Sequence, residues 1–140
     1  MRMFDTKSGL EIISREESLA LLRTEVIGRV GVVSGDRPEI FPVNYAVCDD
    51  GVVFRTAAGT KLTGALDGPV VFEVDCIDAD TRSGWSVVIH GRAEEVDGFM
   101  RPDQRQAFEA LPVDPWADGP KEHLMRVVPT RMAGRRVGRQ

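Results

Sequence analysis

Alternating apolar and polar positions dominate the chain from residue 26 onward and predict a small protein made mainly of β-strands. Short runs rich in Val and Ile are separated by turn signals at 35–38, 49–51, 67–69 and 78–84. The predicted strands cover 26–33, 39–48, 51–56, 70–77 and 85–96, with a last strand at 123–129. Short strands at regular spacing favour a barrel or a sandwich over a parallel α/β sheet.

Short helices are predicted to flank these strands. Ser14 and Glu17 have the spacing of a capping box, and Leu19 and Leu22 then supply an apolar stripe for one helix. The segments 60–66 and 101–111 read as two further helices. No repeat, low-complexity tract or linker interrupts the pattern, so residues 1–140 are predicted to form one domain.

Two of the predicted strands carry polar residues on one face only. Glu73 and Asp75 alternate with apolar residues in 70–77, and Ser86 and His90 do so in 85–96. Such mixed faces suit a barrel that lines a polar ligand. They equally suit outer faces wetted by solvent, and the pattern does not decide between the two.

Composition narrows the classes of protein that the chain can belong to. A chain of 140 residues with 42% hydrophobic content has the size of a single domain with one hydrophobic core. Its 22 acidic residues outnumber the 18 basic ones, which disfavours nucleic acid and anionic membranes as partners. No apolar run approaches the ~20 residues of a membrane span, and the first residues lack a signal peptide's apolar core, so a cytoplasmic address is expected. Cys48 and Cys76 lie in apolar runs, which predicts buried free thiols and no metal site.

The segment 54–61 concentrates groups that bind phosphate, where a strand ends in a turn of small residues and a short helix begins. Arg55 offers a fork of donors, Lys61 a point charge, and Thr56 and Thr60 hydroxyl groups, beside the backbone N–H groups of a helix start. A terminal phosphate fits these groups. The alternative is a solvated turn in which Thr60 caps the helix and Arg55 pairs with a carboxylate.

A proline interrupts the predicted strand 39–48. Pro42 cannot join a hydrogen-bonded ladder on both sides, so the strand lies at an edge, is bulged, or lies near something other than a strand. A planar ring fits against such a segment, where Asn44 supplies amide groups and Tyr45 a ring and a hydroxyl. The alternative is an edge proline that blocks aggregation.

The order and spacing of several motifs resemble the pyridoxamine 5'-phosphate oxidase-like, FMN-binding split-barrel superfamily, and more narrowly its small actinobacterial branch beside the nitroimidazole-reductase-like proteins. The motifs lie at 28–31, 41–45, 53–56, 59–62, 71–75, 84–87 and 91–93. The resemblance implies a six-stranded antiparallel split barrel of the Greek-key type with short flanking helices. It also implies a homodimer with FMN in the clefts between the subunits.

By motif position, the resemblance assigns this chain's residues to parts of the cofactor. The phosphate would be held by Arg55, Thr56, Thr60 and Lys61, with a backbone contact from Leu62. The isoalloxazine would lie along Pro42, Val43 and Asn44, close to Phe54. Trp85 and Ser86 would lie at the subunit boundary, and Trp116 would close the cleft.

The function expected from this resemblance is that of an FMN-dependent oxidoreductase that reduces a small planar organic acceptor by hydride transfer. The chain lacks the C-terminal substrate segment of true pyridoxamine phosphate oxidases, so vitamin B6 oxidation is not expected. No catalytic residue stands out, and His90 and His123 are expected to be structural.

Two other functions remain open. One is a deazaflavin-dependent reductase, whose cofactor carries a polyglutamate tail that needs a basic groove. The sequence offers Arg135, Arg136 and Arg139 for it, unless these form a solvated tail. The other is a non-catalytic module that binds flavin, haem or a partner.

Overall fold

Six long strands form the body of the computed structural model, which describes residues 2–57, 60–96, 102, 106, 110, 111, 113, 116, 119 and 123–138, without the side chains of residues 61 and 63. In chain order the elements are β1 (Met3–Phe4), β2 (Glu11–Ile13), α1 (Arg15–Leu22), β3 (Ile27–Ser34), β4 (Arg37–Cys48), β5 (Gly51–Thr56), α2 (Lys61–Ala65), β6 (Pro69–Asp78), β7 (Ser83–Glu95) and β8 (His123–Val137).

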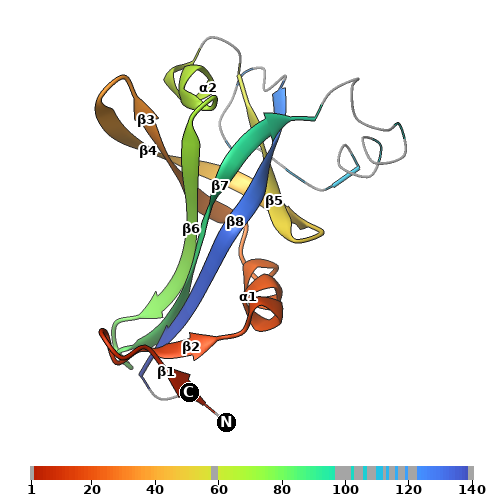
Figure 1. The fold of residues 1–140 in the computed structure, drawn as a ribbon. Coiled ribbons are helices and arrows are strands. Elements are labelled where there is room, and N and C mark those ends of the chain that lie inside the picture. Colours follow the sequence, from red (N-terminus) through yellow and green to blue (C-terminus); the bar gives the residue numbers. More distant parts are fainter. Residues whose placement is uncertain are drawn as a thin grey trace.

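The strands β3 to β8 close into an antiparallel barrel. Their order around it is β8-β5-β4-β3-β6-β7, and β7 pairs again with β8 (Figure 1). The expected split-barrel fold is confirmed. We call the end near Thr56, Glu95 and His123 the upper end, and the end near Ile13 and Trp85 the lower end, as Figure 1 is oriented.

Strand alternation fills the barrel with apolar side chains. Val30, Phe72, Val87 and Ile89 are completely buried inside it. Gly28 leaves room for the Phe72 ring, because a Cβ atom at Gly28 would lie 2.3 Å from that ring. The barrel is therefore a packed core over most of its length.

A second, smaller apolar cluster lies on the other side of β5. It consists of Val53, Val96, Val113 and Leu124. Apolar residues at 52–54 of β5 are consequently buried on both faces of the strand. This explains why the predicted boundaries of that strand, 51–56, match those of β5.

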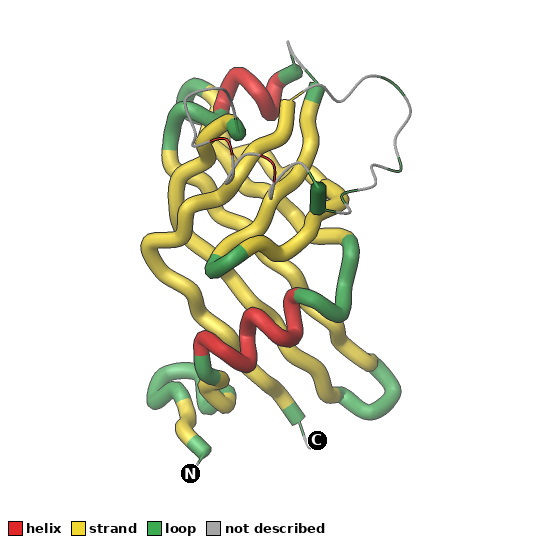
Figure 2. Tube along the Cα trace, turned by 90° about the vertical axis from the view of Figure 1, so that its right-hand side faces the viewer, coloured by secondary structure: helices red, strands yellow, loops and turns green. Residues whose placement is uncertain are grey.

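Helix α1 is capped at its start and hydrogen-bonded to strand β4 at its end. The Ser14 hydroxyl accepts a hydrogen bond of 3.1 Å from the backbone N–H of Glu17, which confirms the first half of the predicted capping box, whereas the Glu17 carboxylate contacts Arg136. At the other end the buried Tyr45 hydroxyl donates a 2.5 Å hydrogen bond to the Leu22 carbonyl. Figure 2 shows α1 crossing the side of the barrel, whereas α2 lies at its upper end.

The last strand is longer than predicted. β8 continues to Val137 instead of ending at residue 129, since residues 131–137 pair with β7 and residues 134–136 also pair with β2. Arginines on this segment hide its strand pattern. The short strands β1 and β2 were not predicted either, and the predicted helix 101–111 lies mostly outside the described residues.

The polar faces of β6 and β7 point away from the barrel interior. Val74 and Val87 are buried inside, whereas Glu73 and Ser86 alternate with them and are partly exposed. The interpretation as outer faces is therefore correct. Cys76 is exposed, contrary to expectation, because β6 runs past Val74 beyond the buried core; Cys48 is half-buried.

No helix within the described residues is both long and apolar enough to span a bilayer.

Candidate functional site

The predicted phosphate turn lies at the upper end, where β5 ends and α2 begins (Figure 1). Thr56 is buried and shares the inward face with Phe54, so the half-buried Arg55 points to the opposite face of β5. Within the part of the chain that the structure describes, the Arg55 guanidinium forms no ion pair. The predicted pairing of Arg55 with a carboxylate is thus not seen among these residues.

Helix α2 adds little to the turn by itself. It has five residues, too few for a substantial helix dipole, so a phosphate here depends on side chains. The Thr60 hydroxyl donates a 3.1 Å hydrogen bond to the Ala57 carbonyl. The Leu62 side chain is buried in the core, so only the backbone of Leu62 could contact a phosphate. The side chain of Lys61 lies outside the described part.

Strand β4 has an open edge beside this turn. Its residues 37–44 pair with β3, and only 45–48 pair with β5. Among the described residues no strand pairs with the other side of 37–44. Pro42 is exposed on this open edge, so the edge is the one of the three predicted possibilities that is observed, whereas Val43 packs against the core.

Asn44 connects three segments at the end of the open edge. Its Oδ1 accepts a 2.9 Å hydrogen bond from the Trp116 backbone N–H, and its Nδ2 donates a 3.4 Å hydrogen bond to the Val26 carbonyl. The Trp116 side chain is exposed by 66%. The structure therefore brings Pro42, Asn44 and Trp116 together, with the Asn44 amide already bound to the backbone.

Three assigned residues do not join this site within one chain. Phe54 is completely buried in the core. Trp85 and Ser86 lie at the lower end, ten residues along β7 from Glu95, which is roughly 30 Å in a strand. Any contact between these two residues and a cofactor at the upper end needs a second chain.

The C-terminal arginines are part of the lower end of the barrel. Arg135 Nη2 lies 3.3 Å from Asp5 Oδ2, and Arg136 Nη2 lies 2.6 Å from Glu17 Oε1. Their side chains are exposed by only 28% and 15%. The interpretation as a solvated tail is wrong for both, because β8 continues through them; Arg139 lies outside the described residues.

A pocket at the barrel mouth was not predicted. It has a volume of about 300 Å³ and is lined by Leu66, Asp67, Ala93, Glu94, Glu95, His123 and Met125. His123 Nδ1 contacts Glu95 Oε1 in it. These two residues are 28 positions apart, and only the register of β7 on β8 brings them together.

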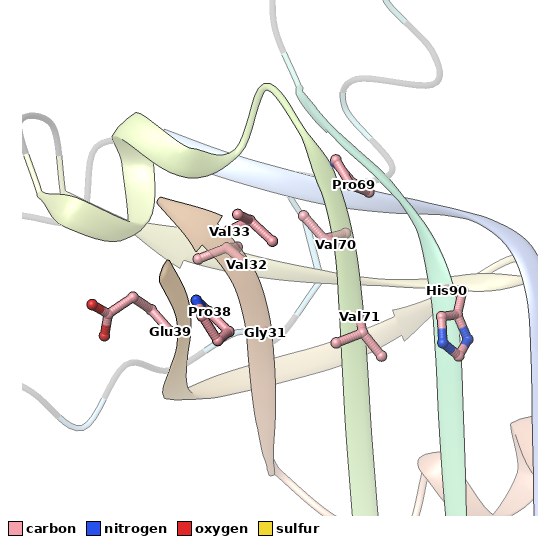
Figure 3. A pocket seen from close by; sticks show the side chains of 9 residues that line it. All are labelled: Gly31, Val32, Val33, Pro38, Glu39, Pro69, Val70, Val71 and His90. Atoms are coloured by element: carbon pink, nitrogen blue, oxygen red, sulfur yellow. The ribbon is translucent and has the colours of Figure 1, made fainter. Parts of the chain in front are cut away.

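An outer groove lies across β3, β4, β6 and β7. Figure 3 shows its lining, in which Val33, Pro38 and Val71 surround Gly31, and His90 lies at one end. Its volume is also about 300 Å³. Arg131 Nη2 lies 3.4 Å from both ring nitrogens of His90.

The outer face also carries a carboxyl group that titrates near neutrality. Burial raises the pKa of Glu73 to about 7, helped by the neighbouring Asp75 and opposed by Arg29. Arg29 Nη1 lies 3.8 Å from Glu73 Oε1. Arg29 in turn pairs in register with Pro42, so this group lies two strands from the open edge.

Comparison with known proteins agrees with the fold and with the motif order. The family model described as pyridoxamine 5'-phosphate oxidase matches residues 14–136. The chain is 32% identical to the protein Rv0080 of Mycobacterium tuberculosis, with 97% of this chain and 92% of that protein covered.

Two solved structures extend the comparison. The FAD binding protein from Mycobacterium smegmatis is 35% identical, with a TM-score of 0.74 over 91% of this chain and 98% of that one. A conserved protein of unknown function from Corynebacterium diphtheriae is 31% identical, with a TM-score of 0.73 over 90% and 96%. The family match covers most of the barrel, and the chain belongs to the pyridoxamine 5'-phosphate oxidase family.

Proposed function

We propose that the protein is a flavin-binding oxidoreductase whose cofactor phosphate lies at the turn of Arg55, Thr56 and Thr60. The observation that carries the proposal is the Arg55 guanidinium, half-buried and without an ion pair among the described residues, in the segment whose residues resemble the phosphate-binding motif of the family. A phosphate oxygen would supply the charge-assisted hydrogen bonds that this group lacks.

The isoalloxazine ring is proposed to lie along the open edge of β4. Pro42 offers a flat apolar surface there, and the exposed Trp116 is held at the same edge by Asn44. A bound flavin accepts a hydride and passes electrons on, while the protein orients the ring and tunes it. A small planar organic molecule is the acceptor class that suits stacking at such an edge.

The proposed assembly is a homodimer with the cofactor between the subunits. An open strand edge at 37–44 is a site for pairing or covering by another chain. Val33 and Ile40, on the same strand pair, are half or more exposed. A second copy would cover these side chains, and it would bring its own Trp85 and Ser86 to the boundary.

The deazaflavin alternative fits the described residues less well than a flavin does. A deazaflavin tail would need Arg135 and Arg136, but both are engaged by carboxylates. A haem needs an axial ligand; His90 lies beside Arg131, whereas His123 contacts Glu95 through Nδ1, a partner that metal-ligating histidines commonly have, so the absorption spectrum decides between haem and flavin. Flavin is the cofactor class that we propose, with FAD supported by the relative from Mycobacterium smegmatis and FMN by the motif order.

The test is the absorption spectrum of the purified protein, followed by titration with riboflavin, FMN, FAD, a deazaflavin and hemin. The expected result is flavin absorbance, together with micromolar or tighter binding of a phosphorylated flavin. Analytical ultracentrifugation should show that the protein sediments as a dimer. Riboflavin, which lacks the phosphate, should bind at least about tenfold more weakly, because charge-assisted contacts are worth ~1.5–3 kcal/mol.

Two outcomes would contradict parts of this proposal. Absence of flavin binding at tens of micromolar would overturn the cofactor assignment, and a Soret band would replace it with haem. Failure of the reduced flavoprotein to be reoxidised by any nitro, quinone or enone acceptor under anaerobic conditions would leave a binding module without oxidoreductase activity.

A further inference from the structure

We propose that the barrel-mouth pocket binds the adenosine half of FAD, so that the protein prefers FAD to FMN. This inference rests on the proposed flavin site, because the pocket would receive the part of the nucleotide that continues beyond the first phosphate. The pocket is the one lined by Leu66, Asp67, Ala93, Glu94, Glu95, His123 and Met125.

The pocket lies next to the proposed phosphate turn. Thr56, the last residue of β5, pairs in register with His123 of the pocket. Helix α2 leads from the turn, at Lys61, to Leu66 and Asp67 of the pocket. Five helical residues rise ~7.5 Å, a distance that a pyrophosphate and a ribose can span.

The size and the apolar walls of the pocket suit a nucleobase. Its volume of about 300 Å³ is at the lower limit of ligand pockets, which is enough for part of a dinucleotide. Leu66 and Met125 are buried core residues that reach the pocket, and Ala93 packs against the same core. Aliphatic side chains and a thioether contact the face of an aromatic base favourably.

The polar groups of the pocket suit adenosine and disfavour phosphate. Carboxylates such as Glu95 and Asp67 accept hydrogen bonds from ribose hydroxyls and from the adenine amino group. Glu94 forms an ion pair with Arg126, in which Oε1 and Nε are 3.3 Å apart. The partner of Glu95 is His123. The acidic groups would repel a pyrophosphate, which keeps the phosphates on the side of Arg55.

The test compares FAD and FMN on the full-length protein. In the wild type, FAD should bind at least about tenfold more tightly than FMN. Glu95→Gln should weaken FAD about tenfold by removing the charged acceptor, with less than about a twofold change for FMN. Asp67→Trp, a substitution at an exposed rim residue, should block the pocket with the same selectivity.

The matched control is Glu11→Gln. Glu11 is likewise a strand glutamate whose carboxylate has a side-chain partner, Arg2 at the lower end, and its replacement should change neither affinity. AMP should compete with FAD in the wild type and should not displace FMN.

The outcomes separate this inference from the proposed function. Equal wild-type affinities for FAD and FMN, or equal losses of both in Glu95→Gln and in Asp67→Trp, would overturn the adenosine site while the flavin proposal stands. Absence of binding by either flavin would overturn the proposed function itself.

Discussion

The two ends of the barrel use arginine in different ways. At the lower end Arg135 and Arg136 point at Asp5 and Glu17, and their side chains are mostly covered. At the upper end Arg55 is half-buried and has no ion pair among the described residues. The partners of each arginine, and not its proximity to other basic residues, therefore separate the two arginines that join parts of the fold from the one that we propose for the cofactor phosphate.

The sequence suggests a basic groove at Arg135 and Arg136. In the structure both side chains lie at the lower end and contact carboxylates, so no basic groove is seen among them. Each guanidinium there joins β8 to a segment far away in the chain: Arg135 contacts Asp5, which follows β1, and Arg136 contacts Glu17 of α1. Such ion pairs contribute little to stability individually. They do, however, occupy both guanidinium groups with protein carboxylates. A polyanionic tail would have to displace them before it could bind.

The largest effect is expected from removing Arg55, for which the described residues supply no ion pair. Arg55→Ala should weaken flavin nucleotide binding by about 10- to 100-fold, because a charge-assisted contact to phosphate is worth ~1.5–3 kcal/mol. Fluorescence titration with FMN and FAD measures it. The control is Arg135→Ala, which should leave both affinities within about twofold; the reverse ranking of the two variants would break the comparison.

A substitution at the lower end should affect stability and not binding. A Cβ atom at Gly134 would lie 2.2 Å from the Ser18 hydroxyl and 2.4 Å from the Ile13 side chain, so α1 and β2 would have to shift. Gly134→Ala should reduce the free energy of unfolding by about 1–3 kcal/mol, as overpacking does. Denaturant unfolding measures this loss.

The flavin affinity of folded Gly134→Ala, measured at a temperature well below its midpoint, should equal that of the wild type. A loss of affinity comparable with that of Arg55→Ala would show that the two ends are not independent.

The smallest effect is expected midway between the ends, at Glu73. Its pKa is about 7 in the folded chain against 4.5 for an ordinary glutamate, so the folded state favours the protonated form. The stability that this contributes is complete below about pH 4.5 and is lost as the pH rises through 7. The Tm of the wild type should therefore fall, relative to Glu73→Gln, by a few degrees between pH 5 and pH 8.

Scanning calorimetry across that range measures the Glu73 effect, with Glu16→Gln on the exposed side of α1 as the control. A constant difference between wild type and Glu73→Gln at all pH values would mean that Glu73 titrates in its ordinary range.

Local patterns were sufficient to predict most of the barrel. β5 is an apolar run buried on both faces and bounded by turns, and its limits were predicted without error. The edge position of Pro42 was one of the three possibilities that its missing N–H group allowed. The extension of β8 was not predicted, because Arg131, Arg135 and Arg136 give its second half the composition of a solvated tail.

The site could be predicted only as far as single segments determine it. Asn44 was expected to offer its amide to a ring, but the amide binds the backbone of Trp116, 72 residues away. The contact between His123 and Glu95 likewise depends on strand register rather than on any motif. Such contacts require the three-dimensional pairing of strands and loops.

The most direct test of the central claim is the NMR spectrum of the arginine Nε–Hε groups during titration with FMN. We expect the Arg55 resonance, assigned by its loss in Arg55→Lys, to shift and become protected as the phosphate binds, while those of Arg135 and Arg136 stay unchanged. An unchanged Arg55 resonance at saturating FMN, with shifts at Arg135 or Arg136 instead, would contradict it.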